Sequence, residues 1–126
     1  MRVLLDTHVL IWYLEGNQTL SRPQRELIVK PETEVFVSIA SLWEIAIKSS
    51  IGKLKLTRSL TDILQQLSVQ SFEILSIAPG HVLQVATLPF HHRDPFDRMI
   101  IAQAKVEFLH IVTVDTNFSS YGVKVI

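Results

Sequence analysis

Short apolar runs alternate along the whole chain with segments whose apolar residues recur at helical spacing. The runs predict strands over residues 3–5, 35–37, 73–77, 110–114 and 123–126. Helices are predicted over residues 8–14, 39–50, 59–68, 79–88 and 94–109, with one more opened by Ser21 and Pro23. Strands that alternate with helices favour a mostly parallel sheet covered on both faces. The sequence therefore predicts an α/β fold.

The composition fits one domain with a hydrophobic core. The chain has 126 residues, of which 48% are apolar and 19% are charged, so we expect a single domain over residues 1–126. The absence of cysteine excludes disulfides, thiol-ligated zinc and cysteine nucleophiles. This composition is compatible with a reducing compartment, and we expect a cytoplasmic protein.

Neither a membrane segment nor a strong overall charge is predicted. No apolar stretch approaches the length of a membrane span. Asp6 and His8 interrupt the first apolar run, and no small-residue cleavage site follows it, so we do not expect a signal peptide. The 12 basic and 12 acidic residues balance, so a nucleic-acid partner would require a local basic patch.

Four acidic residues are predicted to lie at one edge of the sheet. Asp6 and Asp115 directly follow the first and fourth predicted strands. Glu44 and Asp97 are expected in the first turns of the helices after strand two and before strand four. Because crossovers are right-handed, helix N-termini lie at the same edge as the carboxyl ends of the strands. If the first strand lies between the second and fourth, the acids meet at a topological switch point.

Each of these acids also has a purely structural interpretation. Asp6 can cap the first helix, Glu44 fits a capping-box pattern, and Asp115 can form an Asx turn. Asp94 alone can cap the helix that follows it, so capping gives a weaker structural explanation for Asp97. Only the four acids as a set favour a functional site.

Clustered carboxylates repel one another, so they favour a bound cation or proton. A set of oxygen donors without cysteine favours the hard cations Mg²⁺ and Mn²⁺. Such ions activate water and neutralise phosphate charge in phosphodiester hydrolysis. The sequence therefore points to metal-dependent phosphoryl chemistry.

Four segments, LLDTHVLIWYL, SIASLWEIAIKSSIGKL, HRDPFDRMIIAQA and IVTVDTNF, resemble the motifs of PIN-domain ribonucleases, especially VapC-type toxins of prokaryotic toxin–antitoxin pairs. The likeness runs from Arg2 to Ile126. It implies a three-layer α/β/α sandwich with about five strands in the order 3-2-1-4-5. It further implies an Mg²⁺- or Mn²⁺-dependent endoribonuclease, a homodimer, and a cognate antitoxin whose C-terminal segment lies across the active site.

The resemblance also assigns roles to residues. It implies that Asp6, Glu44, Asp97 and Asp115 are the catalytic, metal-binding acids. Asp6 and Asp97 would be the direct ligands, and Glu44 and Asp115 would bind through water or position the nucleophile. Thr113 fills the family's hydroxyl position and would orient Asp115 or a water.

Four residues near the acidic helix have less certain roles. Asp94, in DPFD, is a reserve candidate for the metal site. Arg98 could offset carboxylate repulsion, contact phosphate, or pair with an acid of the antitoxin. His91 and His92 fit a surface loop, with RNA contact or general acid catalysis as the alternative.

Basic residues follow the second motif. Lys48, Lys53, Lys55 and Arg58 form a stretch without an intervening acid, which is typical of a solvated surface. The alternative is binding of an RNA phosphate backbone, in which Arg93 would share. The larger aromatic residues are predicted to lie in or near the core: Trp12, Tyr13, Phe36, Trp43 and Phe72.

Two other functions are compatible with parts of the pattern. One is a phosphatase or phosphoacceptor with Asp6 as nucleophile, although His8 stands where a DxD pair would need a second acid. The other is a non-catalytic module that binds RNA or protein. The complete set of acids favours the nuclease over both.

Overall fold

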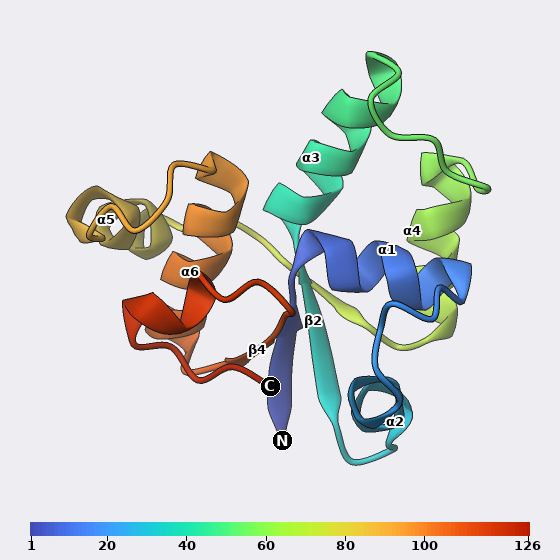
Figure 1. The fold of residues 1–126 in the computed structure, drawn as a ribbon, viewed down its shortest axis with the longest axis horizontal. Helices are drawn as coiled ribbons and strands as arrows, with labels where there is room; N and C mark the ends of the chain where they lie inside the picture. The colour runs from blue at the N-terminus through green and yellow to red at the C-terminus, as the bar shows by residue number, and fades with distance from the viewer.

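The computed structural model describes residues 1–126 and contains a four-stranded sheet in the order β3-β2-β1-β4 (Figure 1). All three strand pairs are parallel. The strands are β1 (Arg2–Leu5), β2 (Glu34–Ser38), β3 (Glu73–Leu75) and β4 (His110–Val112). The predicted α/β class and the position of β1 between β2 and β4 are therefore confirmed.

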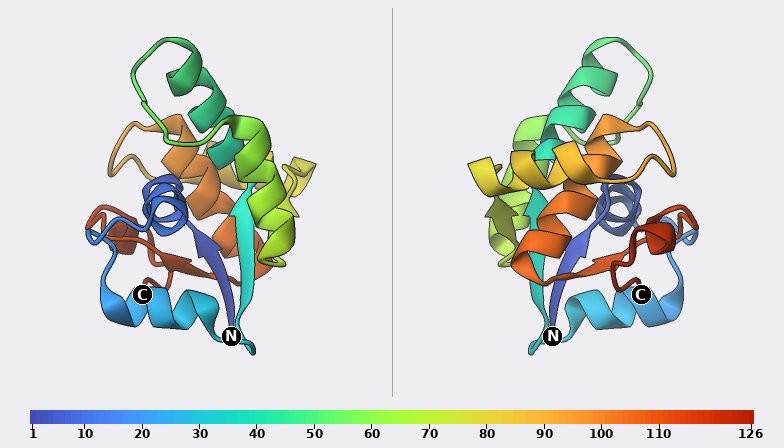
Figure 2. Two further views of the ribbon diagram at one scale, coloured as in Figure 1. Left: turned by 90° about the vertical axis from the view of Figure 1, so that its right-hand side faces the viewer. Right: turned by 90° about the vertical axis from the view of Figure 1, so that its left-hand side faces the viewer.

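Helices cover both faces of the sheet, which makes three layers (Figures 1 and 2). The helices are α1 (Thr7–Glu15), α2 (Arg22–Val29), α3 (Ile39–Ser50), α4 (Leu60–Val69), α5 (Pro79–Thr87), α6 (Pro95–Glu107) and the 3₁₀ helix η1 (Phe118–Tyr121). Helices α1, α2 and α4 lie on one face, and α5, α6 and η1 lie on the other, while α3 extends beyond the ends of the strands (Figure 1). None of these helices has the length and apolar character that crossing a membrane requires.

Two hydrophobic cores lie on the two faces because successive side chains of a strand point in opposite directions. Val3 and Leu5 of β1 belong to the core beneath α1, α2 and α4. Leu4 belongs to the core beneath α6, with Phe36 of β2. These central strands are apolar without interruption because both of their faces are buried.

The predicted fifth strand is reduced to one isolated parallel bridge between Ile111 and Val125. The amide of Ile111 donates to Lys124 O at 2.8 Å, and that of Ile126 donates to Ile111 O at 2.9 Å. The amide of Thr113 donates to Ile126 O at 3.4 Å, and the side-chain amide of Gln24 in α2 donates to the carbonyls of Thr113 and Ile126, at 3.1 and 2.9 Å. The expectation of a full strand over residues 123–126 was therefore wrong.

Helix α3 has the predicted bounds but a different cap. Ser38 is the N-cap, and its hydroxyl accepts from Ala40 N at 3.0 Å. Glu44 therefore lies in the second turn, and the capping-box interpretation was wrong. Ser41 is buried and instead accepts a hydrogen bond from the hydroxyl of Thr7 at 3.0 Å.

The aromatic residues divide between core and surface. Phe36 and Phe72 are buried, as predicted, while Trp12 and Tyr13 pack against the core and are partly buried. Trp43 is 60% exposed, which corrects the prediction for that residue. Leu42 and Ile45 of the same helix lie in the core, whereas Trp43 faces away from it and its ring lies 5.3 Å from that of Phe96.

Candidate active site

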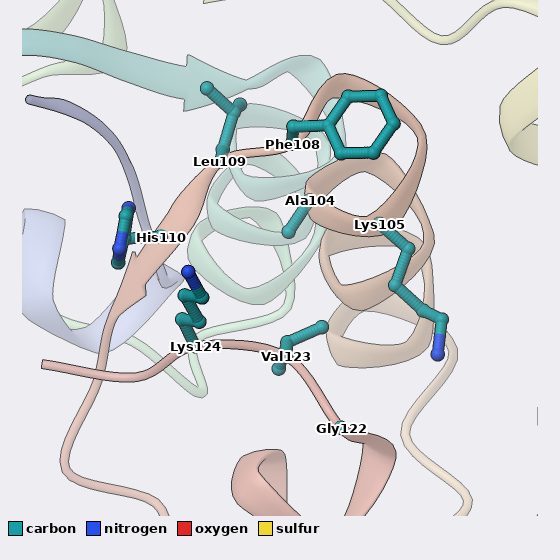
Figure 3. Close-up of a pocket in the computed structure, with 8 residues that line it drawn as sticks. All are labelled: Ala104, Lys105, Phe108, Leu109, His110, Gly122, Val123 and Lys124. Atoms are coloured by element: carbon teal, nitrogen blue, oxygen red, sulfur yellow. The ribbon is translucent and has the colours of Figure 1, made fainter.

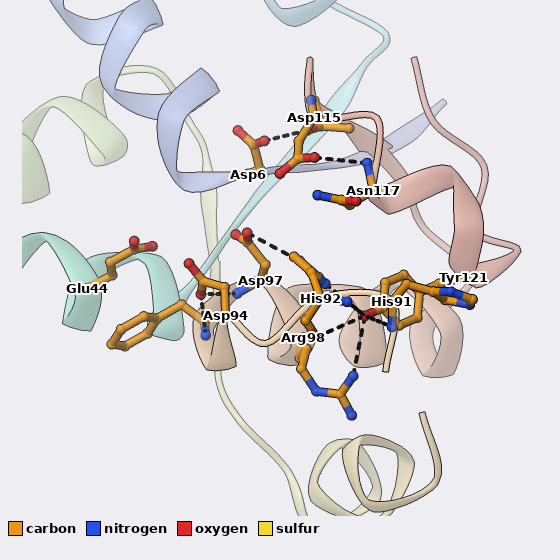
Figure 4. Close-up of polar contacts among 12 residues, drawn as sticks. Asp6, Glu44, His91, His92, Asp94, Asp97, Arg98, Asp115, Asn117 and Tyr121 are labelled. Atoms are coloured by element: carbon orange, nitrogen blue, oxygen red, sulfur yellow. Dashed lines mark hydrogen bonds and ion pairs between the residues drawn. The ribbon is translucent and has the colours of Figure 1, made fainter. Parts of the chain in front are cut away.

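The four predicted acids meet at the carboxyl edge of β1, β2 and β4 (Figure 4). Asp6 follows β1, Glu44 lies on α3, Asp97 lies in the first turn of α6, and Asp115 comes shortly after β4. The pKa of the Asp97 carboxyl is raised to about 8, first by burial and then by the charges of Asp94, Asp6, Glu44 and Asp115. These five carboxyl groups therefore form one electrostatic unit.

Asp6 is both a helix cap and a member of this unit. Its Oδ1 accepts from Val9 N at 2.7 Å, which caps α1. Its Oδ2 accepts from the hydroxyl of Thr113, whose Oγ1 also accepts from Asp115 N at 3.0 Å. Burial is the main reason that the pKa of Asp6 is raised, although both of its hydrogen bonds lower it. Thr113 thus joins the two acids that follow the central strands.

Asp94 caps α6, as the sequence predicted. Its Oδ1 accepts from Phe96 N at 2.9 Å and from Asp97 N at 3.0 Å. The cap uses Oδ1, so Oδ2 is available to a ligand. The carboxyl group of Asp97 accepts no capping hydrogen bond, and the Asp97 side chain is 16% exposed. Asp97 therefore combines burial with electrostatic repulsion and gains nothing from a cap.

Glu44 is the most deeply buried acid of the site, with 2% of its surface exposed. Its Oε2 pairs with Lys48 Nζ, but its Oε1 is buried and has no hydrogen-bond partner. The hydrogen bond that Lys48 donates to Glu44 is the main reason that the pKa of Lys48 is raised. Burying a carboxylate oxygen without a hydrogen-bond partner costs free energy, so a ligand bound at Oε1 would stabilise the site.

Asp115 forms the Asx turn that was its structural alternative. Its Oδ1 accepts from Asn117 N at 2.9 Å. Ligand atoms of Asp115, Asp97 and His92 nevertheless all lie within 4.8 Å of one another. The turn therefore orients Asp115 at the site and does not remove it from the site.

The donor set fits a hard divalent cation. All five acids offer oxygen, no thiol is present, and Glu44 Oε1 is unpaired. A cation would also relieve the repulsion that raises the pKa of Asp97. The residues present are therefore suited to a metal centre.

Arg98 does not face the acids. Its guanidinium donates to the carbonyls of Pro89 and Leu88, at 2.7 and 3.2 Å, and to the hydroxyl of Tyr121 at 3.3 Å. It also lies over the ring of Phe90, 4.1 Å from the centroid. The arginine thus holds the loop before α6 and forms no ion pair that would offset the repulsion of the acids, while its predicted roles toward phosphate or an antitoxin stay predictions.

Of the other basic candidates, Lys48 forms an ion pair with Glu44 of the acidic unit. Lys53, Lys55 and Arg93 are exposed and form no ion pair. A solvated surface explains this exposure, and a role in binding RNA stays a prediction.

His92 was expected in a surface loop, with RNA contact or general acid catalysis as the alternative, but its side chain is only 13% exposed and lies beside Asp97. Its Nε2 lies 3.4 Å from Asp97 Oδ2, and its Nδ1 lies 2.7 Å from the hydroxyl of Tyr121 (Figure 4). Its position just before DPFD was a signal that it lies near the acids. Tyr121 carried no such signal, because the contact joins residues 29 positions apart.

A cavity of about 320 Å³ lies at the other end of α6 (Figure 3). It is lined by Ala104, Lys105, Phe108, Leu109, His110, Gly122, Val123 and Lys124. No carboxylate side chain lines it, so it is separate from the acidic site.

Comparison with known proteins agrees with this geometry. The PIN domain family model matches residues 3–124. Ribonuclease VapC22 of Mycobacterium tuberculosis is 30% identical over 120 residues, which cover 94% of this chain and 91% of that protein. A chain from the structure of VapBC2 of Rickettsia felis bound to promoter DNA covers 100% of this chain and 98% of its own, with 16% identity and a TM-score of 0.75. DNA-bound VapBC from Salmonella typhimurium gives the same identity and TM-score, over 100% of this chain and 97% of its own. The resemblance seen in the four sequence motifs is therefore confirmed, and the chain belongs to the PIN-domain family.

Proposed function

We propose that this protein is a metal-dependent endoribonuclease and the toxin of a VapBC-type toxin–antitoxin pair. The observation that carries the proposal is the meeting of Asp6, Glu44, Asp97 and Asp115 at one edge, with Oε1 of Glu44 buried and unpaired. The family and the name of the relative, Ribonuclease VapC22, support an action on RNA.

We propose that Asp6 and Asp97 bind Mg²⁺ or Mn²⁺ directly, and that Glu44 and Asp115 act through water or position the nucleophile. When bound, the ion supplies an activated water and neutralises charge on the attacked phosphate. Thr113 holds Asp6 and Asp115 in a fixed relation through its two hydrogen bonds. Asp94 is a reserve ligand, because its cap occupies only Oδ1.

The chain's own electrostatics support the need for a cation. Five neighbouring carboxyl groups repel an approaching RNA phosphate, just as they repel one another. Lys48 neutralises part of this charge through Glu44. The exposed Lys53, Lys55 and Arg93 would attract the phosphate backbone beside the site.

We further propose a cytoplasmic homodimer that an antitoxin inhibits by covering the acids. The VapBC complexes among the structural relatives support an antitoxin partner. Exposed apolar side chains are available for such contacts, among them Trp43, Val82, Leu83 and Phe90.

Mapping of RNA ends tests the proposed activity. Purified wild-type protein and the Asp6→Asn variant are incubated with total RNA and Mg²⁺ or Mn²⁺, and new ends are sequenced. Asp62→Asn is the matched control, because Asp62 lies in the first turn of α4 and is exposed. Defined new ends are expected with the wild type and with Asp62→Asn only. Ends that persist in Asp6→Asn or in excess chelator would contradict the proposal.

The rival functions give other results in the same samples. A phosphoacceptor would yield a trapped phosphate ester on Asp6. A non-catalytic module would bind RNA without producing new ends. Either result would replace the nuclease proposal.

A further inference from the structure

Tyr121 is buried, and its hydroxyl contacts His92, the neighbour of Asp97 (Figure 4). Its oxygen lies within range of three N–H donors: the amides of His91 and His92, at 3.2 and 3.1 Å, and the guanidinium of Arg98, at 3.3 Å. The hydroxyl also lies 2.7 Å from Nδ1 of His92 and 3.4 Å from the carbonyl of the same residue. Three donors already use the lone pairs of the oxygen, so its hydrogen is left to bind the nearest acceptor.

That acceptor is Nδ1 of His92. A neutral imidazole carries one N–H, and a hydrogen bond accepted at one nitrogen fixes the hydrogen on the other. The hydrogen of the ring therefore lies on Nε2. The opposite tautomer would direct a fourth N–H at the hydroxyl of Tyr121 and leave the tyrosine hydrogen only the longer contact at 3.4 Å.

Nε2 of His92 faces Asp97. It is buried and forms no hydrogen bond, and the nearest acidic oxygen is Oδ2 of Asp97 at 3.4 Å. This distance is long for a hydrogen bond. Active-site hydrogen bonds are often long in the absence of ligand and shorten when the site is loaded. An N–H at this place is a donor directed at one oxygen of a proposed ligand.

We propose that Tyr121 and His92 form a positioning pair for Asp97. Tyr121 sets the tautomer of His92, and His92 then donates from Nε2 to Oδ2 of Asp97, which holds the carboxylate in the orientation that binds the ion. His92 is not itself a metal ligand, because hydrogen occupies the nitrogen that faces the site. The role in catalysis rests on the proposed function, whereas the tautomer and the effect on metal binding do not require any action on RNA.

Nitrogen NMR of the full-length protein tests the tautomer directly. Protein labelled with ¹⁵N at histidine is saturated with Mg²⁺, so that the Asp97 carboxyl is ionised, and is compared with the His92→Gln variant, which identifies the two ring nitrogens of His92. Hydrogen on Nε2 and a bare Nδ1 are expected. Hydrogen on Nδ1 would overturn the proposal.

Calorimetric titration with Mn²⁺ tests the effect on Asp97. Loss of a group that orients a metal ligand lowers metal affinity roughly 10- to 100-fold, which is the expectation for His92→Leu. His92→Gln keeps an N–H near Asp97 and is expected to recover most of that loss. His110→Leu is the matched control, since His110 lines the separate cavity at the other end of α6, and it should bind Mn²⁺ like the wild type.

Two results would contradict the positioning role. One is unchanged Mn²⁺ affinity in a folded His92→Leu variant, and the other is no recovery in His92→Gln. Electron spin-echo spectra add a third criterion, because a ¹⁴N coupling to Mn²⁺ that disappears in His92→Gln would make His92 a ligand. If instead the metal and NMR results hold but no RNA is cut, the proposed function fails and the positioning pair remains.

Discussion

The hydroxyl of Thr113 donates a hydrogen bond to Oδ2 of Asp6, across 107 positions of sequence. The bond joins the carboxyl ends of β1 and β4, and the same oxygen of Thr113 accepts from Asp115 N at 3.0 Å. One buried hydroxyl thus holds two of the proposed metal-binding residues in register.

Thr113→Val tests this link because it replaces the hydroxyl with a methyl group of similar size. It leaves Oδ2 of Asp6 without its donor in a buried place, so we expect a loss of about 1–3 kcal/mol in the free energy of unfolding. RNA cleavage should fall roughly 10- to 100-fold. Urea unfolding and a cleavage assay measure the two effects. Thr113→Ser, which keeps the hydroxyl, should preserve both, and equal losses in Ser and Val would refute the link.

Stability of the metal-free protein should fall as the pH rises from about 4 to about 8. Burial and the neighbouring acids raise the pKa of Asp97 from its ordinary value of 3.8 to about 8. The native state therefore binds more protons than the unfolded state in this window, and the free energy of unfolding decreases with pH. The raised pKa of Asp6 acts in the same direction.

Asp97→Asn removes the titration of that carboxyl, so its stability should depend less on pH than the wild type's. Urea unfolding at pH 5.5 and pH 8 in chelator measures the difference, with Asp62→Asn as the control on an exposed acid. A variant with the same slope as the wild type would show that Asp97 titrates normally.

Divalent cations should stabilise the native protein. An ion that binds only the folded state adds about 2.7 kcal/mol at 100 times its Kd. Thermal unfolding with Mg²⁺ or Mn²⁺ should therefore shift upward with concentration, and EDTA should reverse the shift. The double variant Asp6→Asn, Asp97→Asn should show no shift. A wild-type protein that melts at the same temperature throughout would contradict a metal centre at these acids.

Lys48→Met should destabilise the metal-free protein more than the metal-bound protein. Lys48 is the ion-pair partner of the buried Glu44, so its removal leaves a buried carboxylate uncompensated. Because the lysine side chain is 38% exposed, we expect a moderate loss of about 1–2 kcal/mol. A bound cation takes over part of the compensation. Urea unfolding with and without Mn²⁺ checks this, and an equal loss in both conditions would place the ion away from Glu44.

The central part of the fold followed from sequence because local and tertiary requirements agree there. The uninterrupted apolar residues of β1 and β2 are what strands buried on both faces require. Residues 39–50 form α3 with the predicted bounds. The convergence of the acids then followed from the parallel topology.

The failures arose where a distant residue decides the local structure. The side-chain amide of Gln24 binds the carbonyl of Ile126, where a fifth strand was expected, together with that of Thr113. Arg98 binds the carbonyls before α6, although its position beside Asp97 suggested that it could offset the repulsion among the carboxylates. The contact between His92 and Tyr121 depends on how η1 packs, which no short-range pattern encodes.

The rate of cleavage of one defined RNA by wild type and Asp97→Asn tests the central claim most directly. The substrate is an RNA with a mapped cleavage site, and the assay is run with Mg²⁺, Mn²⁺ or EDTA. Wild type and Asp62→Asn should cleave with either ion and not in EDTA, and Asp97→Asn should be slower by at least about 100-fold. Cleavage by Asp97→Asn at the wild-type rate, or by the wild type in EDTA, would contradict a nuclease centre built on these acids.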